Sequence, residues 1–507
     1  MITFQHVSFS YDSHGEQEAG QRTEDLQDIH LTVHDGECVL LTGKSGCGKT
    51  TITRLVNGLV PHFYPGKLRG EVLLDGRNVS EMPLYETASL VGSVFQNPRT
   101  QFFNVDTDSE IAFGLENRAF PREQIEEKVA SAAKDLKIEN LRGRNIFSLS
   151  GGEKQKIAFA SVYAMNPSVY LLDEPSSNLD MESVASLQSH LKMLKSQGKT
   201  ILIVEHRLHY LMDIADRIIV LNEGRIKKDY SAREFLSLSD EERRSMGLRT
   251  TDLRKELPLV TSGKEQEIWL ELKNVSLFYK KKAVLENINE KFSQGEVIAL
   301  VGKNGAGKTT FSRALCGLHK EIKGDFLRDG RIISKKKRQK ISYMVMQDVN
   351  YELFAESVEA ECTFGIKNPD ANLVAETMDA LGLTSFSERH PGTLSGGQKQ
   401  RLAVAVGQVC KKELILFDEP TSGLDYKSME RVAKIVRKLS EQGKILFIVT
   451  HDYEFFCRTC SRMLVFSDGE IHCDLQCRAE NKEEIRQLFF STAGEKQSGN
   501  KEGDCFA

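Results

Sequence analysis

Four short motifs occur twice in this chain, in the same order in each half. "GKSGCGKTT" begins at Gly43 and returns as "GKNGAGKTT" at Gly302. Further along, "LSGGEKQK" returns as "LSGGQKQR", "LLDEPSSNLD" as "LFDEPTSGLD" and "IVEH" as "IVTH", and in these three pairs the copies are 245 residues apart. A fixed order at a constant spacing indicates a duplicated structural unit. The sequence therefore predicts one domain of about 230 residues that is written twice.

The segment between the two copies reads as a linker. From Ser237 to Glu267 it is charged, weakly periodic, and contains the Pro and Gly that mark irregular structure. We expect a first domain at 1–235, a linker with one short helix at 236–267, a second domain at 268–493 and a polar tail at 494–507. A polar insertion from Asp12 to Asp25 is expected, with the tail, to form mobile surface.

Composition narrows the class of protein. Of the 507 residues, 40% are hydrophobic and 28% charged, which is typical of a globular chain. The net charge of -4 gives no basic field, so nucleic acid is not the expected partner. No apolar run approaches the roughly 18 residues that cross a bilayer, and the start "MITFQHVSFSY" has no signal-peptide pattern. If a membrane is involved, we expect another chain to span it.

The first repeated motif predicts a phosphate-binding loop. "CVLLTG" reads as a buried strand that ends at Gly43, and the helical spacing of "KTTITRLVNGL" follows it. The glycines let the backbone approach closely, so that N–H groups and the helix N-terminus surround phosphates. Lys49 would reach the β- and γ-phosphates, and Thr50 would place its hydroxyl on Mg²⁺. Gly302 to Thr309 repeats this arrangement.

Paired acids follow two further buried strands. "VYLLD" delivers Asp173 and "LILFD" delivers Asp418, and each is followed by a glutamate, Glu174 or Glu419. Neighbouring residues on a strand point in opposite directions, so the two acids can divide their work. The aspartate would hold Mg²⁺ through water, and the glutamate would polarise the attacking water in phosphoryl transfer.

The complete motif set resembles that of ABC-type ATPases, over nearly all of both halves. This resemblance implies an α/β fold of two tandem P-loop nucleotide-binding domains. Each would have a RecA-like α/β core, an N-terminal antiparallel β subdomain and an α-helical signature subdomain. It also implies that the "LSGG" helix of one half meets the γ-phosphate bound by the other half. Two ATP molecules, with Mg²⁺, would then be held head to tail within one chain.

The resemblance assigns a role to residues at every motif. Tyr11 and Tyr279 match the aromatic that stacks on adenine, and the polar insertion after Tyr11 makes Tyr279 the better match. The implied catalytic residues are Glu174, Glu419, His206 and His451. The implied metal-site residues are Thr50, Gln96, Asp173, Thr309, Gln347 and Asp418. The implied ATP-binding residues are Tyr11, Gly43, Lys44, Ser45, Gly46, Cys47, Gly48, Lys49, Thr50, Thr51, Ser150, Gly151, Gly152, Glu153, Tyr279, Gly302, Lys303, Asn304, Gly305, Ala306, Gly307, Lys308, Thr309, Thr310, Ser395, Gly396, Gly397 and Gln398.

Both sites keep the residues that hydrolysis needs. Many two-copy ABC proteins lose the glutamate or histidine of one site, and here neither is lost. A histidine that ends an apolar strand can also be an ordinary buried residue. Because the rest of the motif set is present, we expect His206 and His451 to contact the γ-phosphate and both sites to hydrolyse ATP.

The loops after the two glutamines resemble those of energy-coupling-factor importers. "FQNP" at Phe95 with "VEHR" at Val204, and "MQDV" at Met346, match the ATPases of that family. The resemblance implies a peripheral protein on the cytoplasmic membrane face, partnered by a transmembrane scaffold and a substrate-capturing membrane subunit. The cargo would be a vitamin, a metal or a related micronutrient that never touches the ATPase. Arg99 departs from the family, where this position is often acidic.

Two other functions fit the same motif set. A tandem ATPase of a simple-sugar importer has similar length, although its second signature is usually altered. An ATPase that acts on ribosomes or nucleic acid would carry a long basic linker or zinc modules, and the segment here is short and mixed in charge. Copurification with a small membrane scaffold, a sugar permease or ribosomes separates the three.

Three further features allow more than one interpretation. In "VFQNPRTQFF", Phe102 and Phe103 either contact a partner helix or cover a local core. Cys457, Cys460, Cys473 and Cys477 have the spacing of a zinc site but fall in apolar segments, which favours buried thiols. "KKKRQK" at Lys335 is a phosphate- or lipid-binding patch or, more commonly, a solvated face.

Overall fold

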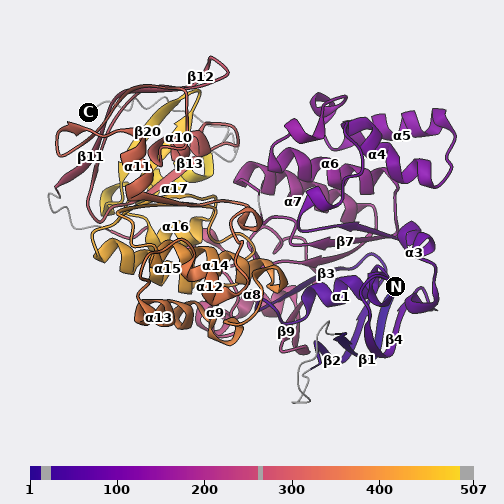
Figure 1. Cartoon of the computed structure of the whole chain (residues 1–507). Helices are drawn as coiled ribbons and strands as arrows, with labels where there is room; N and C mark the ends of the chain where they lie inside the picture. The colour runs from indigo at the N-terminus through magenta and orange to yellow at the C-terminus, as the bar shows by residue number, and fades with distance from the viewer. Residues whose placement is uncertain (13–23, 178, 261–266, 492–507) are drawn as a thin grey trace.

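The two halves of the chain form two lobes that lie side by side (Figure 1). The computed structural model describes residues 1–12, 24–177, 179–260 and 267–491. The predicted insertion at Asp12 to Asp25 and the tail at 494–507 therefore fall largely or wholly outside the described residues. Within the described residues, each lobe contains a four-stranded and a six-stranded sheet.

The four-stranded sheet of the first half is antiparallel. Its strands are ordered β2-β1-β4-β5, and their bounds are β1 Ile2–Tyr11, β2 Leu26–Val33, β4 Gly66–Leu74 and β5 Arg77–Asn78. Buried residues recur along β1 at Ile2, Phe4, Val7 and Phe9. They pack in one cluster with Val39 and Leu41, so the antiparallel sheet covers one face of the six-stranded sheet.

The six-stranded sheet carries the phosphate loop. Its order is β10-β9-β3-β8-β7-β6, and every pairing is parallel except that of β10 with β9. The bounds are β3 Cys38–Gly43, β6 Val91–Val94, β7 Val169–Asp173, β8 Thr200–Val204, β9 Arg217–Asn222 and β10 Arg225–Ser231. Every residue of β3, β7 and β8 is buried, as expected for strands covered on both faces.

Helices cover the remaining surfaces of the first half. They are α1 Lys49–Val56, α2 Leu59–His62, α3 Leu84–Leu90, α4 Thr107–Asn117, α5 Arg122–Asp135, α6 Gly151–Ala164, α7 Met181–Ser196, α8 Ala232–Ser237 and α9 Asp240–Ser245. Helices α4, α5 and α6 pack on one another and form the helical subdomain. The helical spacing expected through Leu59 is divided between α1 and α2, because Gly58 adopts a left-handed conformation between them.

The second half repeats this plan. The antiparallel sheet contains β11 Ile268–Tyr279, β12 Lys282–Ser293, β14 Ile322–Arg328 and β15 Arg331–Ile332. The six-stranded sheet contains β13 Val297–Gly302, β16 Ser342–Val345, β17 Leu414–Asp418, β18 Ile445–Val449, β19 Arg462–Ser467 and β20 Glu470–Gln476. The helices are α10 Lys308–Leu315, α11 Lys335–Ile341, α12 Val358–Thr363, α13 Ala371–Leu381, α14 Gly396–Val409, α15 Tyr426–Glu441, α16 Tyr453–Thr459 and α17 Lys482–Ser491. The predicted fold class is confirmed.

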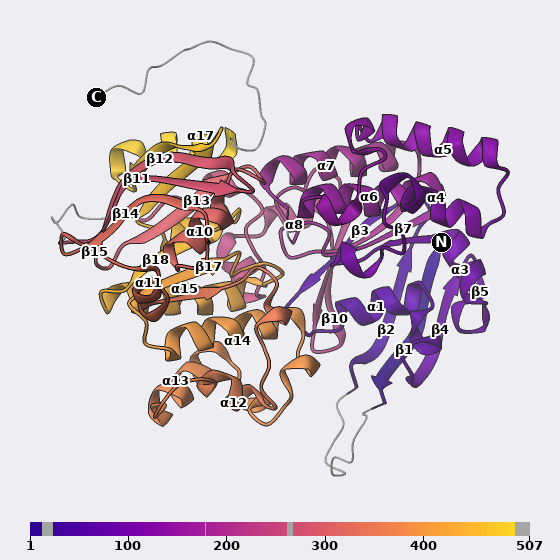
Figure 2. The same cartoon turned by 45° about the horizontal axis from the view of Figure 1, so that its top comes forward.

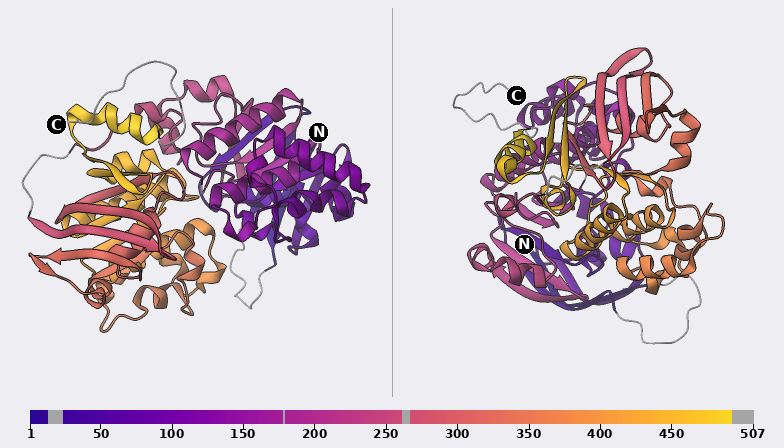
Figure 3. Two further views of the ribbon diagram at one scale, coloured as in Figure 1. Left: turned by 90° about the horizontal axis from the view of Figure 1, so that it is seen from above. Right: turned by 90° about the vertical axis from the view of Figure 1, so that its left-hand side faces the viewer.

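The lobes are arranged head to tail. The antiparallel strands of the second half lie at one end of the molecule, where the first half presents its helices α4 to α6 (Figure 1). At the opposite end the helices α12 to α14 lie on the side of β1, β2 and β4, and the rotated views agree (Figures 2 and 3). Each helical subdomain is therefore brought toward the other half.

The described part of the segment expected as a linker contains regular structure, and its residues 247–250 are buried. It contains the end of α8, all of α9 and the 3₁₀ turn η5 Leu253–Lys255, where a single short helix was expected. Leu248 belongs to the core of the first half and Leu253 to the core of the second. The chain thus crosses from one core to the other within residues 249–252.

The ambiguous surface features are also placed. Lys335 to Lys340 fall in α11, where Arg338 is buried over the Phe326 ring and the lysines are exposed. Cys457, Cys460 and Cys477 are buried, and the described residues contain no group of three or more metal-ligating side chains. Burial raises the pKa of Cys477 to about 12, which keeps the thiol protonated. The described residues also include no helix long and apolar enough to cross a membrane.

Candidate active sites between the two halves

Each phosphate loop is a strand-to-helix turn built on glycines. Gly43 ends β3 with a φ of 144°, and Gly48 precedes α1 with a φ of 101°. A Cβ at Gly48 would lie 2.6 Å from a methyl carbon of Leu26, so only glycine fits. Lys49 Nζ donates to the carbonyl oxygens of Gly43 and Lys44, at 3.1 and 2.9 Å. The buried ammonium is thereby held inside the loop, where it complements an anion.

The second loop has the same geometry. Gly302 and Gly307 adopt φ values of 149° and 98°, and Lys308 Nζ donates to Gly302 O and Lys303 O. Lys308, Thr309, Gln347, Asp418, Glu419 and His451 line a cavity of about 170 Å³ beside it. The predicted catalytic and metal-site residues of the second half are therefore brought together around one space.

The aspartates predicted to hold Mg²⁺ lie next to the loops. Asp418 Oδ2 accepts from Thr309 Oγ1 at 3.4 Å, and Asp173 Oδ2 accepts from Thr53 Oγ1 at 3.5 Å. Burial raises the pKa of Asp173 to about 7, with Glu174 adding to it, and burial raises the pKa of Asp418 to about 6. Asp173 Oδ1 is buried without a hydrogen-bond partner. A buried unpaired carboxylate oxygen fits an oxygen-preferring divalent cation, so these residues suit Mg²⁺.

The glutamates and switch histidines form close pairs. His206 Nε2 lies 3.5 Å from Glu174 Oε1, and His451 Nε2 lies 3.6 Å from Glu419 Oε1. Both glutamates have positive φ, 46° and 52°, which turns them away from the strand direction of the preceding aspartate. Burial raises the pKa of Glu419 to about 8, and burial lowers the pKa of His451 to about 3. A glutamate side chain beside an imidazole can orient a water molecule.

The glutamine loop reaches the first of these pairs. Gln96 Nε2 donates to Glu174 Oε2 at 2.7 Å. In the second half, Gln347 lines the same cavity as Glu419. Gln96, which the sequence predicts at the metal site, is therefore in direct contact with the predicted catalytic Glu174 in the first half.

The signature segments face the opposite half, as the resemblance implies. Ser150 and Ser395 cap α6 and α14 with reciprocal hydrogen bonds to Glu153 and Gln398. A Cβ on Gly397 would lie 3.5 Å from Ser45 Oγ of the first loop. A Cβ on Gly152 would lie 3.7 Å from Asn304 Nδ2 of the second loop. Each phosphate loop thus has a helix N-terminus of the other half beside it, where anionic phosphate is favoured.

Two aspartates that the sequence reasoning did not single out complete these contacts. Asp425 Oδ2 accepts from Ser45 N at 2.6 Å, across the interface. The nearby His206 helps to lower the pKa of Asp425 against the effect of burial. Asp180 is its counterpart: hydrogen bonds from Ser183 lower its pKa against the effect of burial, and the Asn304 N–H of the other half adds to them. The sequence contained a signal for them, because Asp180 ends "LLDEPSSNLD" and Asp425 ends "LFDEPTSGLD".

The two tyrosines expected at adenine differ in exposure. Tyr279 is 63% exposed. Tyr11 is partly buried, its hydroxyl donates to Thr51 Oγ1 at 3.3 Å, and Arg54 Nη1 donates to that hydroxyl at 3.0 Å. Tyr279 is therefore the more exposed of the two rings, and its role at adenine stays a prediction.

The two glutamine loops also meet each other. Arg99 Nη1 lies 3.7 Å from Asp348 Oδ2 across the interface. Both residues line a central cavity of about 230 Å³ together with Gln96 and Gln347. The basic residue at position 99 is therefore turned toward an acid of the other half.

The two phenylalanines of the first glutamine loop lie in different environments. Phe102 is partly buried and packs on the core of the first half, whereas Phe103 is 74% exposed and stacks on Phe113 at 4.8 Å. Phe103 and Phe113 border a mostly apolar groove of about 300 Å³ that continues past Leu59, Leu84 and Met165. In the second half, Phe354 is at the place equivalent to Phe103 and is exposed, and Tyr351 of the same loop is exposed as well.

Comparison with known proteins agrees with this geometry. The family model described as "ABC transporter" matches residues 26–177 and 285–422. Two proteins of Treponema denticola, which their names class provisionally as ABC transporter ATP-binding proteins, are 47% and 42% identical. They align with 97% and 94% of this chain, and with 100% and 97% of their own lengths.

A solved structure shares the fold of the whole chain. It is the archaeal ribosome recycling factor in complex with the ribosomal stalk protein aP1, and its TM-score is 0.63 at 24% identity. The likeness covers 95% of this chain and 94% of that one, and it concerns the fold alone. From the duplicated motifs, the paired sites and these matches, the chain belongs to the ABC transporter ATP-binding family, as a tandem ABC ATPase.

Proposed function

We propose that this chain is the ATP-hydrolysing subunit of an energy-coupling-factor importer that takes up a vitamin, metal or related micronutrient. It would act on the cytoplasmic face of the membrane with a transmembrane scaffold and a substrate-capturing subunit. Closure of the two ATP sites would be transmitted to the transmembrane scaffold through the glutamine loops. The observation that carries the proposal is the apolar groove at Phe103, which lies on the loop that contacts Glu174 through Gln96.

The chemistry of the groove favours an amphipathic helix as its occupant. Aromatic and aliphatic side chains form most of its wall, and a contiguous exposed apolar patch of this kind is typical of an interaction site. Close relatives that carry transporter names support a membrane partner over a ribosomal one. The ribosomal alternative has only a fold likeness below 25% identity in its favour.

Copurification from membranes of the native host tests the partner. Phe103→Ser combined with Phe354→Ser should reduce recovery of a small polytopic scaffold at least tenfold while ATP binding stays unchanged. Ile332→Ser is the matched control, because Ile332 is 66% exposed on β15 and lies outside the groove. Undiminished recovery of the scaffold, or recovery of ribosomes or a sugar permease in its place, would overturn the assignment.

Turnover at each site is tested separately. Glu174→Gln and Glu419→Gln should each lower the rate of ATP hydrolysis at least tenfold, because each removes the base beside a switch histidine. The measurement is steady-state phosphate release with ATP binding as the control. A variant with an unchanged rate identifies its site as silent.

A further inference from the structure

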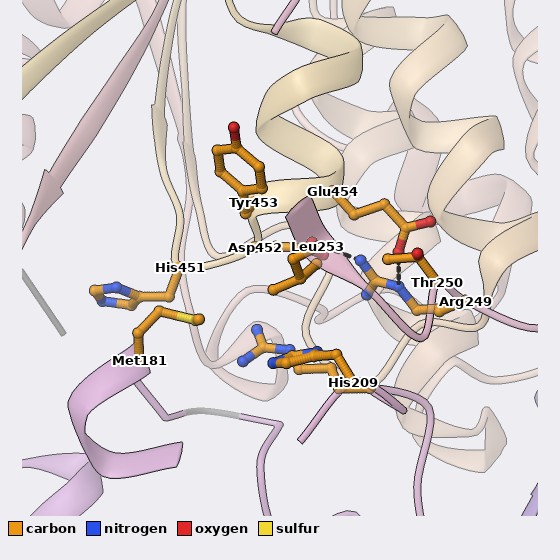
Figure 4. Close-up of a pocket in the computed structure, with 10 residues that line it drawn as sticks. Met181, His209, Arg249, Thr250, Leu253, His451, Asp452, Tyr453 and Glu454 are labelled. Carbon is orange, nitrogen blue, oxygen red and sulfur yellow. Dashed lines mark hydrogen bonds and ion pairs between the residues drawn. The ribbon is translucent and has the colours of Figure 1, made fainter. Parts of the chain in front are cut away.

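The crossing segment carries one fully buried cation. Arg249 is 4% exposed, and Figure 4 shows its guanidinium aimed at two carboxylates of the second half. Its Nε donates to Glu454 Oε2 at 2.9 Å, and its Nη2 donates to Asp452 Oδ1 at 2.5 Å. Both carboxylates are themselves almost completely buried. A buried group with two charged partners on another domain is held far more firmly than a surface ion pair.

One of these carboxylates adjoins the second catalytic site. Asp452 directly follows the switch histidine His451, and Asp452 Oδ2 accepts from Thr421 Oγ1 at 2.8 Å. Thr421 lies two residues after Glu419, and His451 N donates to Glu419 Oε2 at 3.4 Å. Asp452 thus joins the histidine-bearing loop to the glutamate-bearing loop.

The first half has basic residues in place of these two acids. The positions equivalent to Asp452 and Glu454, 245 residues earlier, are Arg207 and His209. The acid that ties the two loops together there is Glu205, which precedes the histidine and accepts from Ser176 Oγ at 2.7 Å. A basic residue and a neutral imidazole offer no site for a second arginine.

The charges explain why Asp452 needs Arg249. Burial alone would raise the pKa of Asp452, but Arg249 and, to a smaller extent, Arg207 lower it to about 2. Burial alone would lower the pKa of Arg249, but Asp452 and Glu454 raise it. Removing the guanidinium would leave Asp452 without its hydrogen-bonded cation and Glu454 with Arg458, 3.5 Å away. The loss at Asp452 favours protonation or movement of the loop that carries His451.

We propose that Arg249 is a positioning residue for the second ATP site, which it serves by holding Asp452 and thereby the loop of His451. Within the described residues, the hydrogen bonds and ion pairs of Arg249 go to the second half alone, although it lines one cavity with Arg207 and His209 of the first half. We therefore expect its loss to affect the second site more than the first. This inference rests on ATP turnover at the second site and does not depend on the importer role.

Site-resolved photolabelling tests the inference in the full chain. A protease recognition sequence inserted after Val260 allows the halves to be separated after labelling. 8-Azido-ATP trapped with vanadate reports turnover at each site, and labelling without vanadate on ice reports binding. Arg249→Met should reduce trapped label in the second-half fragment at least fivefold and in the first-half fragment less than twofold. Labelling without vanadate should stay unchanged in both fragments.

Two matched variants exclude a general structural effect. Arg249→Lys keeps the charge and should restore at least half of the lost trapping, even if Arg249→Met folds poorly. Arg254→Met is the control, because Arg254 belongs to the same segment, is 78% exposed and pairs only locally with Asp252. Equal losses in the two fragments, a second fragment within twofold of the parent, or lost binding would overturn the positioning role. A parent chain that traps no label in either half would contradict the ATPase activity as well.

Discussion

Gln101 and Glu352 occupy equivalent positions in the two glutamine loops but form different hydrogen bonds. Gln101 Oε1 accepts from Phe95 N at 3.3 Å, and its Nε2 donates to Ser93 O at 3.2 Å. Glu352 occupies the equivalent position in the second loop and accepts from Met346 N. Its other oxygen is buried without a partner. The glutamate makes one of the two hydrogen bonds that the glutamine makes.

This difference predicts a pH-dependent gain in stability for Glu352→Gln. Burial raises the pKa of Glu352 to about 7 despite the Met346 N–H, and Asp418 adds to the effect. An acid whose pKa is higher in the folded than in the unfolded state destabilises the fold as pH rises from its ordinary value to about 7. Glu352→Gln should therefore raise the free energy of unfolding by about 1–2 kcal/mol at pH 8. The gain should fade below about pH 5, as measured by urea denaturation at both pH values.

Gln101→Glu is the reverse change in the first half. It should lower stability at pH 8 by a comparable amount and have little effect at pH 5. Denaturation curves for either variant that shift equally at the two pH values would contradict a buried titrating carboxyl as the cause.

At the scale of elements, the strands and motif-bearing turns were predictable because buried parallel strands read as short apolar runs. "CVLLTG", "VYLLD" and "LILFD" coincide with β3, β7 and β17. The roles of Asp180, Asp425 and Arg249 were not predictable in the same way, because each depends on which surface of the other half lies opposite. Phe102 and Phe103 could not be told apart either, since adjacent residues in an irregular loop carry no periodicity.

The contact between β6 and α6 is an element-scale feature that differs between the halves. A Cβ on Gly92 would lie 2.4 Å from Val162 Cγ1 and 2.7 Å from Pro167 Cγ. In the second half, Gly407 stands on α14 at the position equivalent to Val162. A Cβ there would meet Phe417 and Val345 at 3.5 Å, which is ordinary contact.

These spacings predict opposite effects for two glycine-to-alanine changes. Gly92→Ala should destabilise the first half by about 1–3 kcal/mol, because the strand and helix must separate. Gly407→Ala should be neutral or stabilise by up to about 1 kcal/mol, because alanine favours a helix interior. Thermal unfolding of both variants measures the two effects. Similar shifts in the same direction would show that local packing does not distinguish the two contacts.

At the scale of the molecule, the position at which the chain crosses between the halves predicts whether the two fragments of a cleaved chain stay associated. Residues up to Leu248 pack on the first core, while Arg249 and Leu253 are buried in the second half. Cleavage after Val260 leaves this segment attached to the first half and inserted into the second. The fragments should therefore coelute in size-exclusion chromatography, even at high salt, because the buried pairs of Arg249 are poorly screened.

Cleavage between Leu238 and Ser239 is the informative control. It transfers residues 239–260 to the second fragment, so the halves are then connected by Leu248 on the first core in place of Arg249 and Leu253 on the second. Association of the halves should be weaker than after the cut at Val260, because Leu248 contributes less than the buried ion pairs of Arg249 together with Leu253. Fragments that separate equally after either cut would show that the segment adds nothing beyond the covalent link.

The crossing within residues 249–252 joins the two halves covalently, and this connection determines how the protein behaves on dilution. A tethered partner is present at an effective concentration in the millimolar range, whatever the amount of protein in solution. Each first half therefore pairs with the second half of its own chain, without competition from other chains. The specific activity should therefore be the same at nanomolar and micromolar chain. Because neither half has to pair with a copy of itself, the sequences of the two halves were able to diverge. The acids next to the switch histidines are an example: Glu205 precedes His206, whereas Asp452 follows His451.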